Sequence, residues 1–112
     1  MSSSSTAPLF SIIVPTHNSE NYLDECLASL SQQSVEDFEI ICVDDGSSDR
    51  TPEMLAQWSE KEPRLVYKLQ AMQNAGAARN TALAIAKGVL VTFLDSDDVL
   101  PNGTLEAYRA IY

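Results

Sequence analysis

The chain has 112 residues, 45% of them hydrophobic, and its 16 acidic and 7 basic residues give it a net charge of −9. This length suits one domain with a modest core, because domains most often have about 100–150 residues. An acidic chain without a basic stripe is a poor binder of nucleic acid, and no apolar run reaches the roughly 18–20 residues of a membrane helix. We therefore expect neither a nucleic-acid partner nor a membrane segment in this chain.

The polar start of the chain, Met1 to Pro8, lacks the basic and apolar regions of a signal peptide, so we expect a flexible leader over residues 1–8. The first strand is predicted over about Leu9–Val14. A helix with one buried stripe follows, and Asn18 or Ser19 can cap it. The stripe consists of Tyr22, Leu23, Cys26, Leu27 and Leu30.

The second strand is predicted over about Phe38–Val43. The run Thr51-Pro52-Glu53 is typical of a helix start, with a capping threonine, a proline at the first position and an acid in the first turn. This helix should stop before Pro63. A short β-prone run, Leu65–Leu69, predicts the third strand.

The next helix is predicted from Asn74 or Ala75 to Ala86, and its many alanines allow it to approach a sheet closely. Gly88 should end this helix. The run Val89–Leu94 predicts a buried fourth strand, and Pro101–Ile111 predicts a last helix.

This alternation predicts a doubly wound α/β domain over residues 9–112, with an open sheet of about four mainly parallel strands and flanking helices. The chain ends at Tyr112 without a closing signal, so we expect a truncated sheet. Its open edge should favour self-association, and a homodimer is the expected form.

Three carboxylates follow the fourth strand within four positions: Asp95, Asp97 and Asp98. Like charges this close repel one another, and a cation would neutralise them. Carboxylate oxygens are hard ligands, which favours Mg²⁺, Mn²⁺ or Ca²⁺ over zinc. The alternative is an acidic turn after a strand, which is the commoner case for an isolated motif of this kind.

Two other strand ends carry polar residues. Asp44 and Asp45 follow the second strand and could accept hydrogen bonds from a base or a ribose, or they could belong to a solvated surface turn with Asp49 or Thr51 as the helix cap. Gly76 and Arg79 lie at a helix start, where the backbone favours anions. Arg79 could contact a diphosphate or pair with an aspartate.

We assign no catalytic or metal-binding role to the histidine or to the two cysteines. His17 is the only histidine and is not assigned as a base. Cys26 and Cys42 fall on a helix face and in a buried strand, which is typical of reduced core cysteines. A reducing cytoplasm fits this pattern.

Four segments together resemble the family 2 glycosyltransferases that use nucleotide-diphospho-sugars. They are Ser11-Ile12-Ile13-Val14-Pro15-Thr16-His17-Asn18, Val43-Asp44-Asp45-Gly46-Ser47-Ser48-Asp49, Ala77-Ala78-Arg79-Asn80 and Phe93-Leu94-Asp95-Ser96-Asp97-Asp98. They occur in the order and at the spacing of the family, and the likeness covers about residues 10–112.

The resemblance implies a GT-A fold that binds a nucleotide sugar, often a UDP-sugar, with Mg²⁺ or Mn²⁺. By this analogy Asp45 reads the uracil with support from Asp44. The implied nucleotide-binding residues are Pro15, Thr16, Glu20, Asp44, Asp45, Gly76, Arg79 and Asp95. The implied metal ligands are Asp95, Asp97 and Asp98.

Two departures from the family pattern matter. Asn74 stands where the family usually has a glycine, and the catalytic base of the family belongs to a later motif, expected beyond Tyr112. The resemblance therefore implies the donor-binding part of an enzyme for polysaccharide biosynthesis, inactive alone, whose glycan, lipid or protein acceptor is not indicated.

Three alternatives to a glycosyltransferase compete with this interpretation. One is a nucleotide-binding or regulatory module without transferase activity. A nucleotidyltransferase should have a glycine-rich basic loop near the first strand, and a phosphate-receiver domain should have paired acids there; Pro15-Thr16-His17-Asn18 has neither.

Overall fold

A computed structural model describes residues 7–112. In chain order its elements are β1 (Phe10–Thr16), α1 (Leu23–Ser31), β2 (Phe38–Asp45), α2 (Thr51–Lys61), β3 (Leu65–Gln70), α3 (Ala75–Ile85), β4 (Leu90–Phe93) and α4 (Thr104–Ile111). Residues 1–6 of the predicted leader lie outside the described range. Pro8 is already tied to the domain, because its carbonyl accepts a hydrogen bond from the Val89 N–H.

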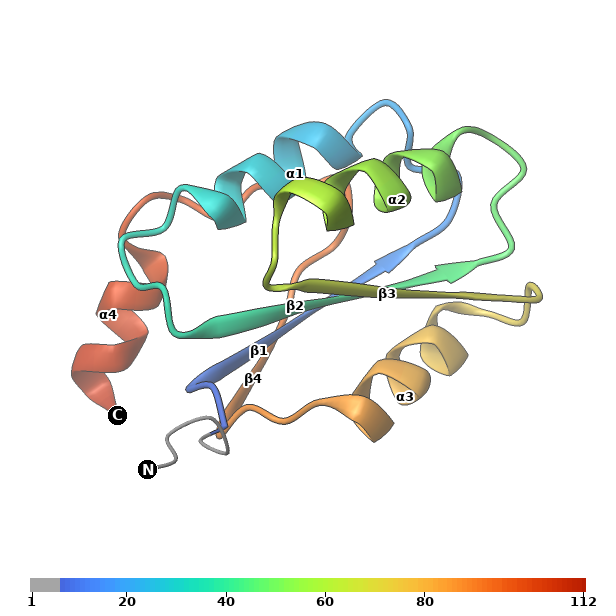
Figure 1. Ribbon diagram of the computed structural model, residues 1–112. Helices are drawn as coiled ribbons and strands as arrows, with labels where there is room; N and C mark the ends of the chain where they lie inside the picture. Colours follow the sequence, from blue (N-terminus) through green and yellow to red (C-terminus); the bar gives the residue numbers. More distant parts are fainter. Residues whose placement is uncertain (1–6) are drawn as a thin grey trace.

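The four strands form one sheet in the order β3-β2-β1-β4, and every neighbouring pair is parallel. The predicted open parallel sheet is therefore confirmed. Figure 1 shows α1 and α2 over one face of the sheet and α3 over the other. Because all strands run the same way, the loops that follow β1, β2 and β4 meet at one edge. No helix within residues 7–112 is long and apolar enough to cross a membrane.

The two central strands are buried on both faces, which explains their continuous apolar runs. Phe10, Ile12 and Val14 of β1 pack in the larger cluster with α1 and α2. Ile13 faces the opposite way and packs with Ala78 and Ala82 of α3. The small alanine side chains let α3 lie directly on the sheet.

The expected helix caps are wrong for α1 and α2. Helix α1 begins at Leu23 without a side-chain cap, and the Ser19 carbonyl accepts the Leu23 N–H instead. The Thr51 hydroxyl accepts a hydrogen bond from the Ser19 N–H, so it joins two loops and does not cap α2. The Asp49 carboxylate, the other expected cap, accepts the Thr51 N–H, but the N-cap residue of α2 is Arg50, which makes no side-chain cap hydrogen bond.

Gly88 does not end α3 as expected, because the helix ends at Ile85 with Ala86 as its extended C-cap. Gly88 instead crosses β1 so closely that a Cβ atom would lie 2.4 Å from the Ser11 nitrogen. The buried fourth strand is also wrong in part. Val91 is 41% exposed and Phe93 is 48% exposed, because β4 is an edge strand that α3 does not cover.

Candidate functional site

The carboxyl ends of β1, β2 and β4 surround a cavity of about 510 Å³. The loop after β1, the Asp45 side chain and the loop after β4 form part of its wall. The segment Met72–Ala75 and the first turns of α3, with Ala78 and Arg79, complete it. This is the edge at which open α/β sheets bind their ligands.

Asp44 is a structural residue of the loop after β2. It is 2% exposed, and its carboxylate accepts hydrogen bonds from the Thr16 hydroxyl at 2.8 Å and from the Ser47 N–H at 3.0 Å. The Ser47 hydroxyl donates to it as well. These bonds tie the end of β1 to the turn after β2, and Asp44 does not line the cavity.

Asp45 lines the cavity, although it is only 5% exposed. Its Oδ1 accepts hydrogen bonds from Gln70 Nε2 at 3.1 Å and from the Gln73 N–H at 2.9 Å. The alternative that the two acids lie in a solvated surface turn is therefore wrong. Both side chains are held in place by polar partners from other segments.

In the loop after β1, the imidazole ring of His17 contacts the backbone carbonyl of Asp45. The distance from His17 Nδ1 to the Asp45 carbonyl oxygen is 2.8 Å, and a carbonyl only accepts, so Nδ1 carries the proton. Asn18 takes a left-handed conformation with φ of 49°. Its Oδ1 accepts the Ser48 N–H, which joins the loops after β1 and β2.

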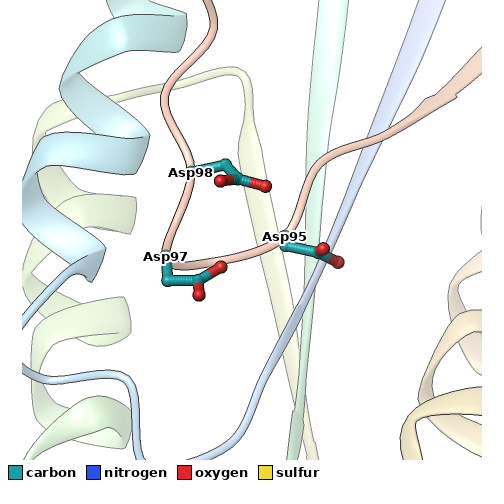
Figure 2. A group of neighbouring side chains, drawn as sticks. All are labelled: Asp95, Asp97 and Asp98. Atoms are coloured by element: carbon teal, nitrogen blue, oxygen red, sulfur yellow. The ribbon is translucent and has the colours of Figure 1, made fainter.

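The loop after β4 carries the acidic group. Asp95, Asp97 and Asp98 each offer a carboxylate oxygen, and these oxygens lie within 4.8 Å of one another. All three side chains are exposed and project from the same loop (Figure 2). The Asp98 N–H donates to the Asp95 carbonyl and closes the turn. Three hard oxygen donors at this spacing fit a hydrated divalent cation.

Arg79 connects α3 with the acidic group. Its Nη2 lies 3.7 Å from Asp95 Oδ1, and the two side chains are 41% and 64% exposed. The pair is loose and solvated, so it contributes little to stability. Both residues line the cavity, so the guanidinium can turn toward an anion there.

The structure brings most of the predicted site residues together. Those that line the cavity are Pro15, Thr16, Asp45, Arg79, Asp95 and Asp97. Asp98 lies beside them in the acidic group. Gly76 does not line the cavity, and the carboxylate of Glu20 accepts the Arg50 N–H away from it.

The sequence reasoning missed several lining residues: His17, Asn18, Ser19, Tyr22, Met72, Gln73, Asn74, Ala75, Ala78 and Ser96. The first three follow a strand end directly, and that position could have identified them. Met72 and Gln73 lie in an irregular segment between β3 and α3, and no sequence pattern marks them.

The two cysteines are free and buried, as expected. Burial raises the pKa of the Cys26 thiol to about 12, with a smaller contribution from the nearby Asp98 carboxylate. Burial also raises the pKa of the Cys42 thiol. Neither thiol is a nucleophile near neutral pH, because the thiolate is the reactive form.

Comparison with known proteins agrees with this geometry. The model of glycosyl transferase family 2 matches residues 11–108. The chain belongs to glycosyltransferase family 2. It is 37% identical over 99 residues to the uncharacterized glycosyltransferase EpsJ of Bacillus subtilis, an alignment that covers 88% of this chain and 29% of EpsJ. It is also 41% identical over 100 residues to an uncharacterized glycosyltransferase of Haemophilus influenzae, covering 88% of this chain and 40% of that protein.

Solved structures of sugar-transferring enzymes have the same fold. TarS residues 1–349 of Staphylococcus aureus, crystallised with UDP, superposes with a TM-score of 0.84 at 39% identity over 90% of this chain and 31% of that chain. The mannosyltransferase PcManGT of Pyrobaculum calidifontis, in complex with GDP-Man and Mn²⁺, gives 0.81 at 31% identity over 90% of this chain and 31% of that one. The fold is therefore GT-A, and the chain spans less than half the length of these family members.

Proposed function

We propose that this chain is the donor-binding part of an inverting glycosyltransferase and that it binds a nucleotide-diphospho-sugar, a UDP-sugar in the first instance. The observation that carries the proposal is one cavity with two kinds of group on its wall. Asp45 ends β2, and Asp95 and Asp97 follow β4 on the other side of β1. Asp45 would accept a hydrogen bond from a base, and Asp95 and Asp97 would be ligands for a metal. A nucleoside diphosphate has its base and its phosphates at opposite ends, which suits this arrangement.

Asp95, Asp97 and Asp98 would hold the divalent cation, Mg²⁺ or Mn²⁺. Their oxygens lie close together and exposed, and such cations keep water and phosphate oxygens as further ligands. When bound, the cation stabilises negative charge on a leaving diphosphate. Arg79, 3.7 Å from Asp95, adds a positive charge on the same side of the cavity.

Transfer of the sugar needs in addition a general base at the acceptor hydroxyl. Within residues 7–112, the carboxylates that line the cavity are Asp45, Asp95 and Asp97, and the proposal uses all three. We therefore propose that a base from outside these residues completes the enzyme, and that the isolated chain binds its donor without transferring the sugar.

The experiment is calorimetry of the full chain with UDP, with and without MnCl₂. We expect UDP and Mn²⁺ each to bind more tightly in the presence of the other, because phosphate oxygens complete the metal shell. The Asp97→Ala variant should lose this mutual enhancement. Asp37→Ala, which removes an exposed acid before β2, is the matched control and should keep it.

Two results would contradict the proposal. Wild-type chain that binds no UDP at millimolar concentration would remove the nucleotide site. Equal manganese affinity in wild type and Asp97→Ala, with UDP present, would remove the metal site from the loop after β4.

A further inference from the structure

The two oxygens of the Asp45 carboxylate are in different situations. Oδ1 accepts both hydrogen bonds, from Gln70 Nε2 and from the Gln73 N–H. Within residues 7–112 no donor contacts Oδ2, although the side chain lines the cavity. One oxygen is therefore saturated by the protein, and the other is left as an acceptor for whatever enters.

Gln70 owes its position to the register of the sheet. It is the direct partner of Asp45 across the parallel β2–β3 pair, so the two side chains lie on the same face. That face is the one covered by α3, where Val43 and Ile41, two and four positions before Asp45, pack against Ala78 and Ala82. The amide of Gln70 can therefore reach both Asp45 and α3.

Asp45 fixes the orientation of that amide. A carboxylate only accepts hydrogen bonds, so the amide must turn its NH₂ group toward Asp45 and its oxygen toward Thr81 of α3. The Thr81 hydroxyl lies 2.8 Å from Gln70 Oε1 and 3.0 Å from the Ala77 carbonyl oxygen, and its single proton can go to either acceptor. When it goes to Gln70, the donors run in one direction, from the Thr81 hydroxyl through Gln70 to Asp45 Oδ1.

We propose that Gln70 and Thr81 are positioning residues, and that they make Asp45 select a nucleobase with a ring N–H over one with a bare ring nitrogen. The inference rests on the proposed function, in which Asp45 accepts a hydrogen bond from the base, and adds the residues that hold Asp45 in place for that contact. Uracil presents N3–H to an acceptor. Cytosine, of the same size, presents the lone pair of N3, and two acceptors facing each other in a partly buried site exclude it.

UDP and CDP are therefore matched probes, and the readout is the ratio of their affinities for the full chain. Thr81→Val removes the hydroxyl at constant shape, and Thr81→Ser restores it. We expect Thr81→Val to lower the UDP-to-CDP ratio about threefold and Thr81→Ser to keep it. Gln70→Ala should lower the ratio about tenfold, because Asp45 then loses a side-chain donor and can rotate.

Asp45→Asn gives the sharpest test. Gln70 Nε2 and the Gln73 N–H are donors and need an acceptor, so they bind the amide oxygen of the new side chain and turn its NH₂ group into the cavity. That group repels N3–H and donates to a bare N3. The preference between UDP and CDP should invert.

Gln57→Ala, an exposed glutamine of α2, is the control and should leave the ratio unchanged. Thermal unfolding of each variant separates a loss of structure from a loss of selectivity, since a purely structural role lowers both affinities together. Wild type that binds UDP, with Thr81→Val and Gln70→Ala both retaining its base preference, or with Asp45→Asn retaining it, would overturn this inference alone. Wild type that binds no UDP would overturn the proposed function and this inference with it.

Discussion

Asp44 and Asp45 are adjacent, yet consecutive side chains of a strand point to opposite faces, and the two acids have different partners. Asp44 holds Thr16 and Ser47 and so orders the loops around the cavity. Asp45 is held by Gln70 and Gln73 and keeps one oxygen toward the cavity. One acid stabilises the loops, and the other is available to a ligand.

Replacing Asp45 by alanine should affect both binding and stability. Nucleotide affinity should fall by about 1–3 kcal/mol, the usual value of a charge-assisted hydrogen bond. The free energy of unfolding should fall by about 1 kcal/mol, because the Gln73 N–H loses a partner. Calorimetry with UDP and thermal unfolding measure the two effects. Unchanged nucleotide affinity would leave Asp45 with a structural role only.

Glu62 gives the chain a specific acid sensitivity. It is 5% exposed, and the Arg64 guanidinium binds both of its carboxylate oxygens, each at 2.9 Å. Hydrogen bonds from the Arg64 side chain lower the pKa of Glu62 from its ordinary value of 4.5 to about 2. The charged form is therefore favoured in the folded state.

A pKa lowered on folding contributes stability above the unfolded value and loses it as pH falls through the folded value. The contribution of Glu62, on the order of 3 kcal/mol, should be complete above pH 4.5 and disappear toward pH 2. Glu62→Gln should lower stability at pH 7. Its difference in stability from wild type should disappear toward pH 2. Glu60→Gln, an exposed neighbour, should change neither. Denaturant unfolding at several pH values checks this, and a wild-type minus Glu62→Gln difference that is constant with pH would contradict it.

At the residue scale, the sequence identified side chains whose role follows from their place after a strand. Asp45, Asp95 and Asp97 could be predicted because polar residues at parallel strand ends share one edge. Gln70 and Thr81 could not, because their importance comes from a register and a helix position that bring them to Asp45. The resemblance to the family implied Glu20 as a nucleotide-binding residue. It did not predict that the Glu20 carboxylate accepts the Arg50 N–H outside the cavity.

At the scale of elements, the connection from α3 to β4 depends on the close approach of Gly88 to Ser11 of β1. The Gly88 N–H donates to the Ser11 hydroxyl at 2.7 Å, and the Lys87 N–H donates to Glu39 Oε2 at 2.7 Å. The Ser11 hydroxyl donates to Glu39 in turn. This small network joins three strands at their amino ends and sets where β4 starts.

Gly88→Ala should destabilise the fold. The new Cβ would lie 2.4 Å from Ser11 N and 2.6 Å from the Phe10 carbonyl carbon, and backbone atoms cannot give way easily. We expect a loss of about 2–3 kcal/mol, typical of overpacking, measured by denaturant unfolding. Lys87→Ala keeps its backbone N–H and should change stability by less than about 0.5 kcal/mol. Equal stability of Gly88→Ala and wild type would contradict the close approach.

The eight elements were all expected, because apolar runs and helical stripes indicate a strand or a helix whatever its neighbours in the fold. Their ends were less predictable. Ser19 and Thr51 are good caps by type, but their polar groups bond to each other across two loops, and tertiary contacts decided the outcome. The exposure of Val91 and Phe93 also depends on which strand α3 covers, and the pattern of β4 alone does not contain that information.

At the scale of the whole molecule, the sheet has two unpaired edges within residues 7–112, at β3 and at β4. Beside the β4 edge, Val91 and Phe93 are exposed on the face of the sheet against which α3 packs. An unpaired strand edge pairs readily with another strand. In a solution of this chain alone, β4 of a second copy is one strand that can pair with β4.

We therefore expect the chain to form a dimer at high concentration through β4. Val91→Lys should weaken it by roughly 1 kcal/mol or more, because the pairing would bring two like charges together. Ile111→Lys, 85% exposed on α4, should leave it unchanged. Sedimentation over a concentration series measures the association, and a strictly monomeric wild type would contradict it.

The alanines of α3 also have a consequence for the width of the cavity. Ala78 touches the sheet core on one side and the cavity on the other. The short side chains of Ala78 and Ala82 therefore set the distance between α3 and the sheet. Arg79 and Thr81 belong to the same turns of α3. A bulkier side chain at either position would lift α3 and carry both residues away from Asp95 and Gln70 together. The volume of two methyl groups thus governs how far Arg79 and Thr81 lie from Asp95 and Gln70.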